Sequence, residues 1–131
     1  MPAPLDCRFD HIHVFCSDLD CTERWFLEGL GATLVERRMS RGIPLSVLSL
    51  GGAQILLRGA REGEALEPAG GRRFGTDHFG LRVPDVDAAI AELRQRGVTI
   101  EVEPWDITPT TRIAFVKGPD DVRIELIQTQ G

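Results

Sequence analysis

Two stretches of the sequence decide the fold: residues 9–20, Phe-Asp-His-Ile-His-Val-Phe-Cys-Ser-Asp-Leu-Asp, and residues 76–87, Thr-Asp-His-Phe-Gly-Leu-Arg-Val-Pro-Asp-Val-Asp. Aligned without a gap, they place His11 on His78, and the acidic and apolar positions around the two histidines also match. Each stretch is followed by a helical pattern that ends at a glycine, Gly31 or Gly97, and then by an extended run. Self-similarity of this kind indicates a duplicated structural unit.

Each unit is predicted to run strand, helix and then three strands. Aspartates at positions 18 and 85 are suited to cap the two helices, and Gly51-Gly52 is a hairpin signal. The sequence therefore predicts an α+β fold, a single domain over residues 1–131, made of two βαβββ modules at about 8–58 and 76–128. The glycine-rich segment 59–75 joins them. The expected strands are 8–16, 32–38, 44–50 and 53–58, then 77–83, 98–103, 110–117 and 122–128, with helices at 19–30 and 86–96.

Composition excludes several classes of protein. The chain has 131 residues, 42% of them apolar and 27% charged, as in soluble globular domains. No apolar run approaches the roughly 20 residues of a membrane span, and a net charge of −5 argues against a non-specific nucleic-acid binder. Three cysteines near one end form no disulfide framework, and no signal peptide is visible. We expect a cytoplasmic protein with no nucleic-acid or membrane partner.

Three side chains suggest a metal site. Because strand side chains alternate, His11 and His13 share one face, and the repeat gives His78 the position equivalent to His11. On the last predicted strand, Glu125 stands between Ile124 and Leu126, on the face opposite those apolar neighbours. Two imidazoles and one carboxylate suit a divalent metal ion and leave positions open for substrate.

A plainer interpretation stays open at this point. A lone histidine on a strand is more often solvated than metal-bound, and a surface ion pair with Arg123 or Lys117 would also explain Glu125 taken alone. The duplicated positions of two of the three histidines favour the metal.

The sequence resembles the vicinal oxygen chelate superfamily, which includes glyoxalase I, methylmalonyl-CoA epimerase, extradiol dioxygenases, and fosfomycin- and bleomycin-resistance proteins. The resemblance covers about residues 8–128 and implies a curved mixed sheet that cups a metal held by His11, His78 and Glu125. It rests on Asp10-His11-Ile12-His13-Val14, Asp77-His78-Phe79-Gly80-Leu81, and Arg112-Ile113-Ala114-Phe115-Val116-Lys117-Gly118-Pro119-Asp120 leading into Ile124-Glu125-Leu126.

Departures from the family pattern reduce the number of reaction types that fit this chain. Glyoxalase I has a fourth ligand, Glu or Gln, where this chain has Leu56, although Gln54 lies two residues away on the same face. Extradiol dioxygenases usually carry a tyrosine ten residues before the glutamate ligand, where this chain has Phe115, and the chain has no tyrosine. His13 is the remaining histidine and the candidate catalytic base.

We therefore expect a metal-dependent isomerase, epimerase or lyase acting on a small substrate chelated through neighbouring oxygens. The alternatives are an Fe(II)-dependent extradiol-type dioxygenase and a bleomycin-resistance-like binding protein. The metal is expected to be Fe²⁺, Mn²⁺, Ni²⁺, Co²⁺ or Zn²⁺, and the protein a homodimer, with each site built within one chain or across the interface. Expected catalytic residues are His13 and Glu125, and expected substrate contacts are Gln54, Arg58, Trp105, Arg112 and Phe115.

Overall fold

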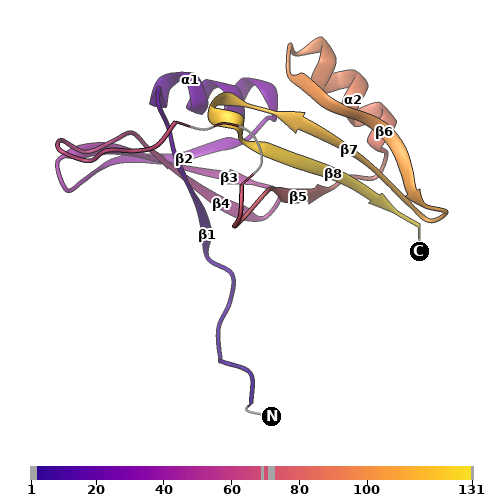
Figure 1. The fold of residues 1–131 in the computed structure, drawn as a ribbon, viewed down its shortest axis with the longest axis horizontal. Coiled ribbons are helices and arrows are strands. Elements are labelled where there is room, and N and C mark those ends of the chain that lie inside the picture. The colour runs from indigo at the N-terminus through magenta and orange to yellow at the C-terminus, as the bar shows by residue number, and fades with distance from the viewer. Residues whose placement is uncertain (1–2, 69, 71–72, 131) are drawn as a thin grey trace.

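The computed structural model describes residues 3–68, 70 and 73–130, and it contains two four-stranded sheets, each with a helix against one face (Figure 1). The first module has β1 His11–Phe15, α1 Leu19–Arg24, the π-helical turn η1 Trp25–Gly29, β2 Thr33–Ser40, β3 Ile43–Leu50 and β4 Ala53–Arg58. The second has β5 Phe79–Arg82, α2 Val86–Gln95, β6 Thr99–Thr108, β7 Thr111–Lys117, the 3-10 turn η2 Pro119–Asp121 and β8 Arg123–Thr129. The predicted order of elements is confirmed in both modules.

The two sheets have the same topology. The strand order is β1-β4-β3-β2 in the first sheet and β5-β8-β7-β6 in the second, and the first strand of each module lies parallel to the last. In the first sheet His13 faces Leu56, and in the second Gly80 faces Glu125. The register therefore confirms that Leu56 stands where the second module has Glu125.

Helix ends follow the predicted capping. The side chains of Asp18 and Asp85 accept hydrogen bonds from the N–H of Cys21 and of Ala88, at 3.1 and 3.0 Å. Gly31 and Gly97, which follow the helices, have positive φ angles of 74° and 81°, a conformation that costs glycine little.

The first helix differs from the prediction of one α-helix over 19–30. Its second half is a wider turn in which the N–H of Leu30 donates to the carbonyl of Trp25, five residues earlier, at 3.3 Å. This turn buries Phe26 completely and places the Trp25 ring against Gly118 of the second module.

One hydrophobic core joins the two modules. Figure 1 shows α1 and α2 on the same side of the molecule, above the strands. Their apolar side chains and the helix-facing residues of both sheets form one buried cluster, which includes Phe26, Leu48, Ile55, Leu57, Val86, Ile90, Ile124 and Leu126. The opposite face of each sheet, called the site face below, carries the polar residues of interest.

The largest differences from the predicted strand boundaries are at β1 and β6. β1 begins at His11 rather than at residue 8, and the Phe9 side chain before it is exposed. β6 continues to Thr108 through Pro104, which is tolerated because β6 is the edge strand of its sheet and needs fewer backbone donors. Within the described residues, no helix is both long and apolar enough to cross a membrane.

Candidate functional site

The second module brings His78 and Glu125 together. His78 directly precedes β5, and its Nε2 lies 3.8 Å from Oε1 of Glu125 on β8. This separation is longer than a hydrogen bond, so each atom keeps a lone pair available. The other ring nitrogen, Nδ1, lies 2.8 Å from Oδ2 of Asp77. An ionised carboxylate only accepts hydrogen bonds, so Nδ1 carries the proton and Nε2 is left free to bind a metal.

An aromatic and a guanidinium complete this group. The centroids of the Phe115 and His78 rings lie 4.9 Å apart, edge to face, and the Arg123 guanidinium carbon lies over the Phe115 ring, 4.5 Å from its centre. Arg123 also donates to Asp77 and, at 2.7 Å, to Glu101. The hydrogen bond from His78 and the charge of Arg123 lower the pKa of Asp77 below its ordinary value. Asp77 therefore stays ionised and holds the His78 ring.

The plainer interpretation of Glu125 does not describe this arrangement. Arg123 pairs with Asp77 and Glu101, and Lys117 pairs with Asp121 at 3.0 Å. Among the described residues, Glu125 makes its ion-pair contact with His78. The Glu125 carboxylate thus has no guanidinium or ammonium partner among them.

The first module repeats half of this arrangement. Nδ1 of His11 lies 2.7 Å from Oδ2 of Asp10, which leaves Nε2 of His11 free in the same way. The register places Gln54 beside His11 and Leu56 beside His13. The first module thus offers one imidazole with an oriented ring, and at the position equivalent to Glu125 it offers an apolar side chain.

His13 shares the site face with His11, as predicted. Their ring centroids are 6.3 Å apart, and the Phe15 ring lies 5.3 Å beyond His13. Partial burial lowers the pKa of His13, and the positive charges of Arg58 and Arg61 nearby lower it further. The ring is therefore neutral at pH 7 and can accept a proton.

A cavity of about 1230 Å³ lies between the modules, and both His13 and His78 line it. His11 is not gathered with the His78–Glu125 pair. Within residues 3–68, 70 and 73–130, no three His, Cys, Asp or Glu side chains lie close enough together to hold one metal ion. One chain therefore presents two incomplete ligand groups, and each has a free imidazole nitrogen.

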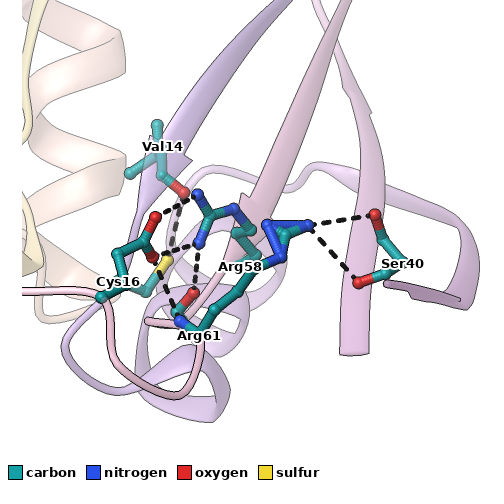
Figure 2. Close-up of polar contacts among 7 residues, drawn as sticks. Val14, Cys16, Ser40, Arg58 and Arg61 are labelled. Carbon is teal, nitrogen blue, oxygen red and sulfur yellow. Dashed lines mark hydrogen bonds and ion pairs between the residues drawn. The ribbon is translucent and has the colours of Figure 1, made fainter. Parts of the chain in front are cut away.

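Other predicted substrate residues have different surroundings. Arg58 donates to both carboxylate oxygens of Glu64, at 2.7 and 3.1 Å (Figure 2). Its guanidinium carbon also lies 4.1 Å from the centre of the Phe15 ring. Arg112 lies on the helix side of its sheet, where it pairs with Asp87 at 2.7 Å and with Asp106 at 3.1 Å. The structure thus does not bring Arg112 to the His78–Glu125 pair.

Trp105 is half-exposed on β6, paired in register with Ile113. Three residues that the sequence analysis did not propose as site residues are Asp77, Arg123 and Glu64. The repeated Asp-His dipeptide was a visible signal for Asp77, since a carboxylate beside a ligand histidine orients the ring. No such pattern marked Arg123, whose partners Asp77 and Glu101 are distant in the sequence, or Glu64, which lies in the irregular segment between the modules.

Comparison with known proteins gives consistent results. The model of the Glyoxalase/Bleomycin resistance protein/Dioxygenase superfamily matches residues 8–126. YwkD of Bacillus subtilis (strain 168) is 29% identical over 122 residues, which are 90% of this chain and 94% of YwkD. A probable lactoylglutathione lyase of Synechocystis sp. is 42% identical over 60 residues, 45% of this chain and 44% of that protein.

Among solved structures, TnmS3, an antibiotic-binding protein from Streptomyces sp. CB03234, superposes with a TM-score of 0.75 at 24% identity. The match covers 98% of this chain and all of TnmS3. The family match, the duplicated βαβββ topology and the paired Asp-His dipeptides agree, and the chain therefore belongs to the glyoxalase/bleomycin resistance protein/dioxygenase superfamily.

Proposed function

We propose that the protein is a metal-dependent enzyme that acts on a small substrate chelated through two neighbouring oxygens. His11, His78 and Glu125 are the proposed metal ligands. The observation that carries the proposal is the duplicated Asp–His pair, which leaves Nε2 free in both modules, together with a Glu125 carboxylate 3.8 Å from one of these nitrogens. Imidazole nitrogens and carboxylate oxygens suit Fe²⁺, Mn²⁺, Co²⁺, Ni²⁺ or Zn²⁺.

We further propose that two copies of the chain share each site. One chain holds the His78–Glu125 pair apart from His11, so a complete ligand set needs His11 from a second copy. A twofold dimer contacts itself through the same surface on both subunits, so it would form two such sites at once. The proposed homodimer is therefore part of the active site.

The proposed chemistry assigns a role to each nearby residue. A bound divalent metal supplies Lewis acidity toward the chelated oxygens. The neutral ring of His13 then accepts a proton from the carbon next to the chelated carbonyl, and Phe115 shields the His78–Glu125 side from water. Glu125 acts as a metal ligand and helps to set the charge at the site. This is the chemistry of an isomerase, epimerase or lyase.

Metal analysis tests the proposal directly. Protein purified without oxygen and then equilibrated with each metal should bind one ion per chain with micromolar affinity or better. His78→Ala should abolish that binding while the protein still unfolds cooperatively. Asp85→Asn, a change at a helix cap far from the ligands, is the matched control and should leave metal content unchanged. Wild-type protein that binds none of these metals would refute the proposal.

Oxygen uptake separates the lyase or isomerase from the dioxygenase. The Fe²⁺-loaded protein should consume no dioxygen with a panel of catechols, because Phe115 replaces the tyrosine that extradiol enzymes use. Dioxygen uptake that matches catechol loss would establish the dioxygenase instead.

A binding protein is the second candidate, and the large cavity between the modules favours it. The same fold serves TnmS3, an antibiotic-binding protein. A binding protein would hold its ligand tightly without turnover, and Glu125→Ala would leave the affinity for that ligand unchanged.

A further inference from the structure

Beyond the proposed ligands, an excess positive charge lies on the site face of the first sheet. Arg58, at the end of β4, and Arg61, three residues later, both contact the Glu64 carboxylate. Arg58 binds it with its guanidinium, whereas Arg61 binds it with its backbone N–H at 3.1 Å. One carboxylate thus accompanies two guanidinium groups, and one positive charge remains.

That charge belongs to Arg61. Its guanidinium donates to the backbone oxygen and the hydroxyl of Ser40, both at a long 3.4 Å (Figure 2). Its Nε is buried and has no hydrogen-bond partner among the residues that the structure describes. Among the described residues, no carboxylate forms an ion pair with the Arg61 side chain. Buried donors are normally satisfied, and a planar guanidinium binds carboxylates and phosphates through two parallel hydrogen bonds. The Arg61 guanidinium therefore lies beside Ser40 with a positive charge that no carboxylate of the described residues balances, and this chemistry suits an anion.

The strand register relates this group to the proposed metal ligand. Along β1 the site face carries His11, His13 and Phe15, which stand opposite Gln54, Leu56 and Arg58 of β4. Four residues of strand, roughly 13 Å, separate the His11 level from the Arg58 level. Halfway between these two levels, Leu56 is paired with His13 on one side and with Val47 on the other. Leu56 and Val47 therefore make the face apolar beside His13.

The cavity runs along part of this path. It is lined by His13 and Phe15 and by Gly59, Ala60 and Glu64, which lie on either side of Arg61 in the sequence. A ligand that starts at His11 and follows the strands would cross His13 and Leu56 before it met the positive charge.

We propose that Arg61, with Ser40 beside it, binds an anionic group at the far end of the substrate. This inference rests on the proposed function and specifies its substrate class. The substrate carries vicinal oxygens at one end, an apolar segment in the middle, and a carboxylate or phosphate roughly 13 Å or more away.

Bifunctional probes test the inference. Monohydroxamates of straight-chain dicarboxylic acids offer two neighbouring oxygens at one end and a carboxylate at the other. Their methyl esters lack the charge, and the matching phosphonates separate preference for phosphate from preference for carboxylate. Binding to the Zn²⁺-loaded protein is measured by calorimetry for the wild type, Arg61→Gln, Arg61→Lys and Arg24→Gln. Arg24, an exposed residue at the end of α1, is the control for net charge.

We expect the longer acids to bind roughly tenfold or more tightly than their esters, and Arg61→Gln to remove that advantage. Arg61→Lys should keep part of this preference for the acids, and Arg24→Gln should keep all of it. The esters should bind all the variants with the same affinity. Thermal unfolding confirms that each variant is folded. The inference is overturned if Arg61→Gln still binds the acids more tightly than the esters, or if the wild type shows no such preference. In either case, binding of the esters to the Zn²⁺-loaded protein would still support the proposed function.

If no hydroxamate binds the Zn²⁺-loaded wild type, the proposed function fails, and a metal-free experiment decides the inference. Acetate and inorganic phosphate are titrated while the Arg61 Nε–H resonance is followed by NMR. A saturable shift of that resonance supports an anion site at Arg61, and an unchanged resonance overturns it.

Discussion

Replacement of Gly118 by alanine should weaken the joint between the two modules. Gly118 follows β7, and a Cβ at this position would lie 2.8 Å from Cε2 and Cζ2 of Trp25 and 2.9 Å from its Cη2. The backbone at Gly118 is extended, with φ −109° and ψ −169°, so alanine meets no backbone strain there. The whole effect should therefore come from the overlap with the Trp25 ring, which is packed against the core and cannot move away cheaply.

The overlap sets the expected magnitude. Overpacking of a well-packed contact costs typically about 1–3 kcal/mol, and we expect about 2 kcal/mol here. In a domain of this size that loss lowers the thermal midpoint by roughly 8 °C. Urea unfolding followed by far-UV circular dichroism measures the change in free energy, and it does not depend on tryptophan fluorescence.

A double-mutant cycle assigns the cause. In a Trp25→Leu background the smaller side chain leaves room for the new methyl group, so Gly118→Ala should cost less than half as much. Gly70→Ala is the control, because no atom of the described residues lies within 4 Å of the position that its Cβ would take. If Gly118→Ala costs the same with and without Trp25, the contact between the modules is not the cause and the reasoning is refuted.

Three further predictions concern single side chains. Glu23 is buried and accepts hydrogen bonds from Arg37 and Ser46, which lower its pKa, so Glu23→Gln should cost about 1–2 kcal/mol at pH 7. Because the pKa of Glu23 is lower in the folded protein, this stabilisation is complete above about pH 4.5 and is lost as the pH falls through the lowered pKa. Acid unfolding of both proteins checks it, and a difference in stability that does not shrink as the pH falls would contradict it. Burial raises the pKa of Cys16 to about 11, so at pH 8 a thiol reagent should modify two cysteines in the native protein and the third only after unfolding; three fast-reacting thiols would be inconsistent with the core. His13→Gln should lower turnover by roughly 10²–10⁴ with metal content unchanged, and a parallel loss of metal would show that His13 supports the ligands instead.

The fold was predictable because its signals are local or repeated. Asp18 and Asp85 cap helices within three residues of themselves, and the match of His11 to His78 gave the second module from the first. The start of β1 and the π-helical turn were not predicted, because the exposure of Phe9 and the packing of Phe26 depend on distant parts of the chain.

The site was predictable only in part. Strand alternation placed His13 on the same face as His11, and the repeat placed Leu56 at the position equivalent to Glu125. The same alternation puts Arg112 with Ala114 and Val116 on the helix side, a signal that the sequence analysis did not use. How the two modules bring their ligand groups together depends on packing between modules, which no strand period specifies.

The central claim is that two chains build each metal site, and subunit complementation tests it most directly. His11→Ala and Glu125→Ala each remove one ligand, so neither homodimer should bind metal. In a mixed dimer with shared sites, one site lacks both His11 and Glu125. The other site keeps all three ligands, because the Glu125→Ala chain supplies its His11 and the His11→Ala chain supplies its His78 and Glu125. Mixing the two variants under conditions of subunit exchange should therefore restore one metal ion per mixed dimer, measured by elemental analysis. If the mixed dimer forms and binds no metal while the wild type does, each site lies within one chain and the claim is wrong.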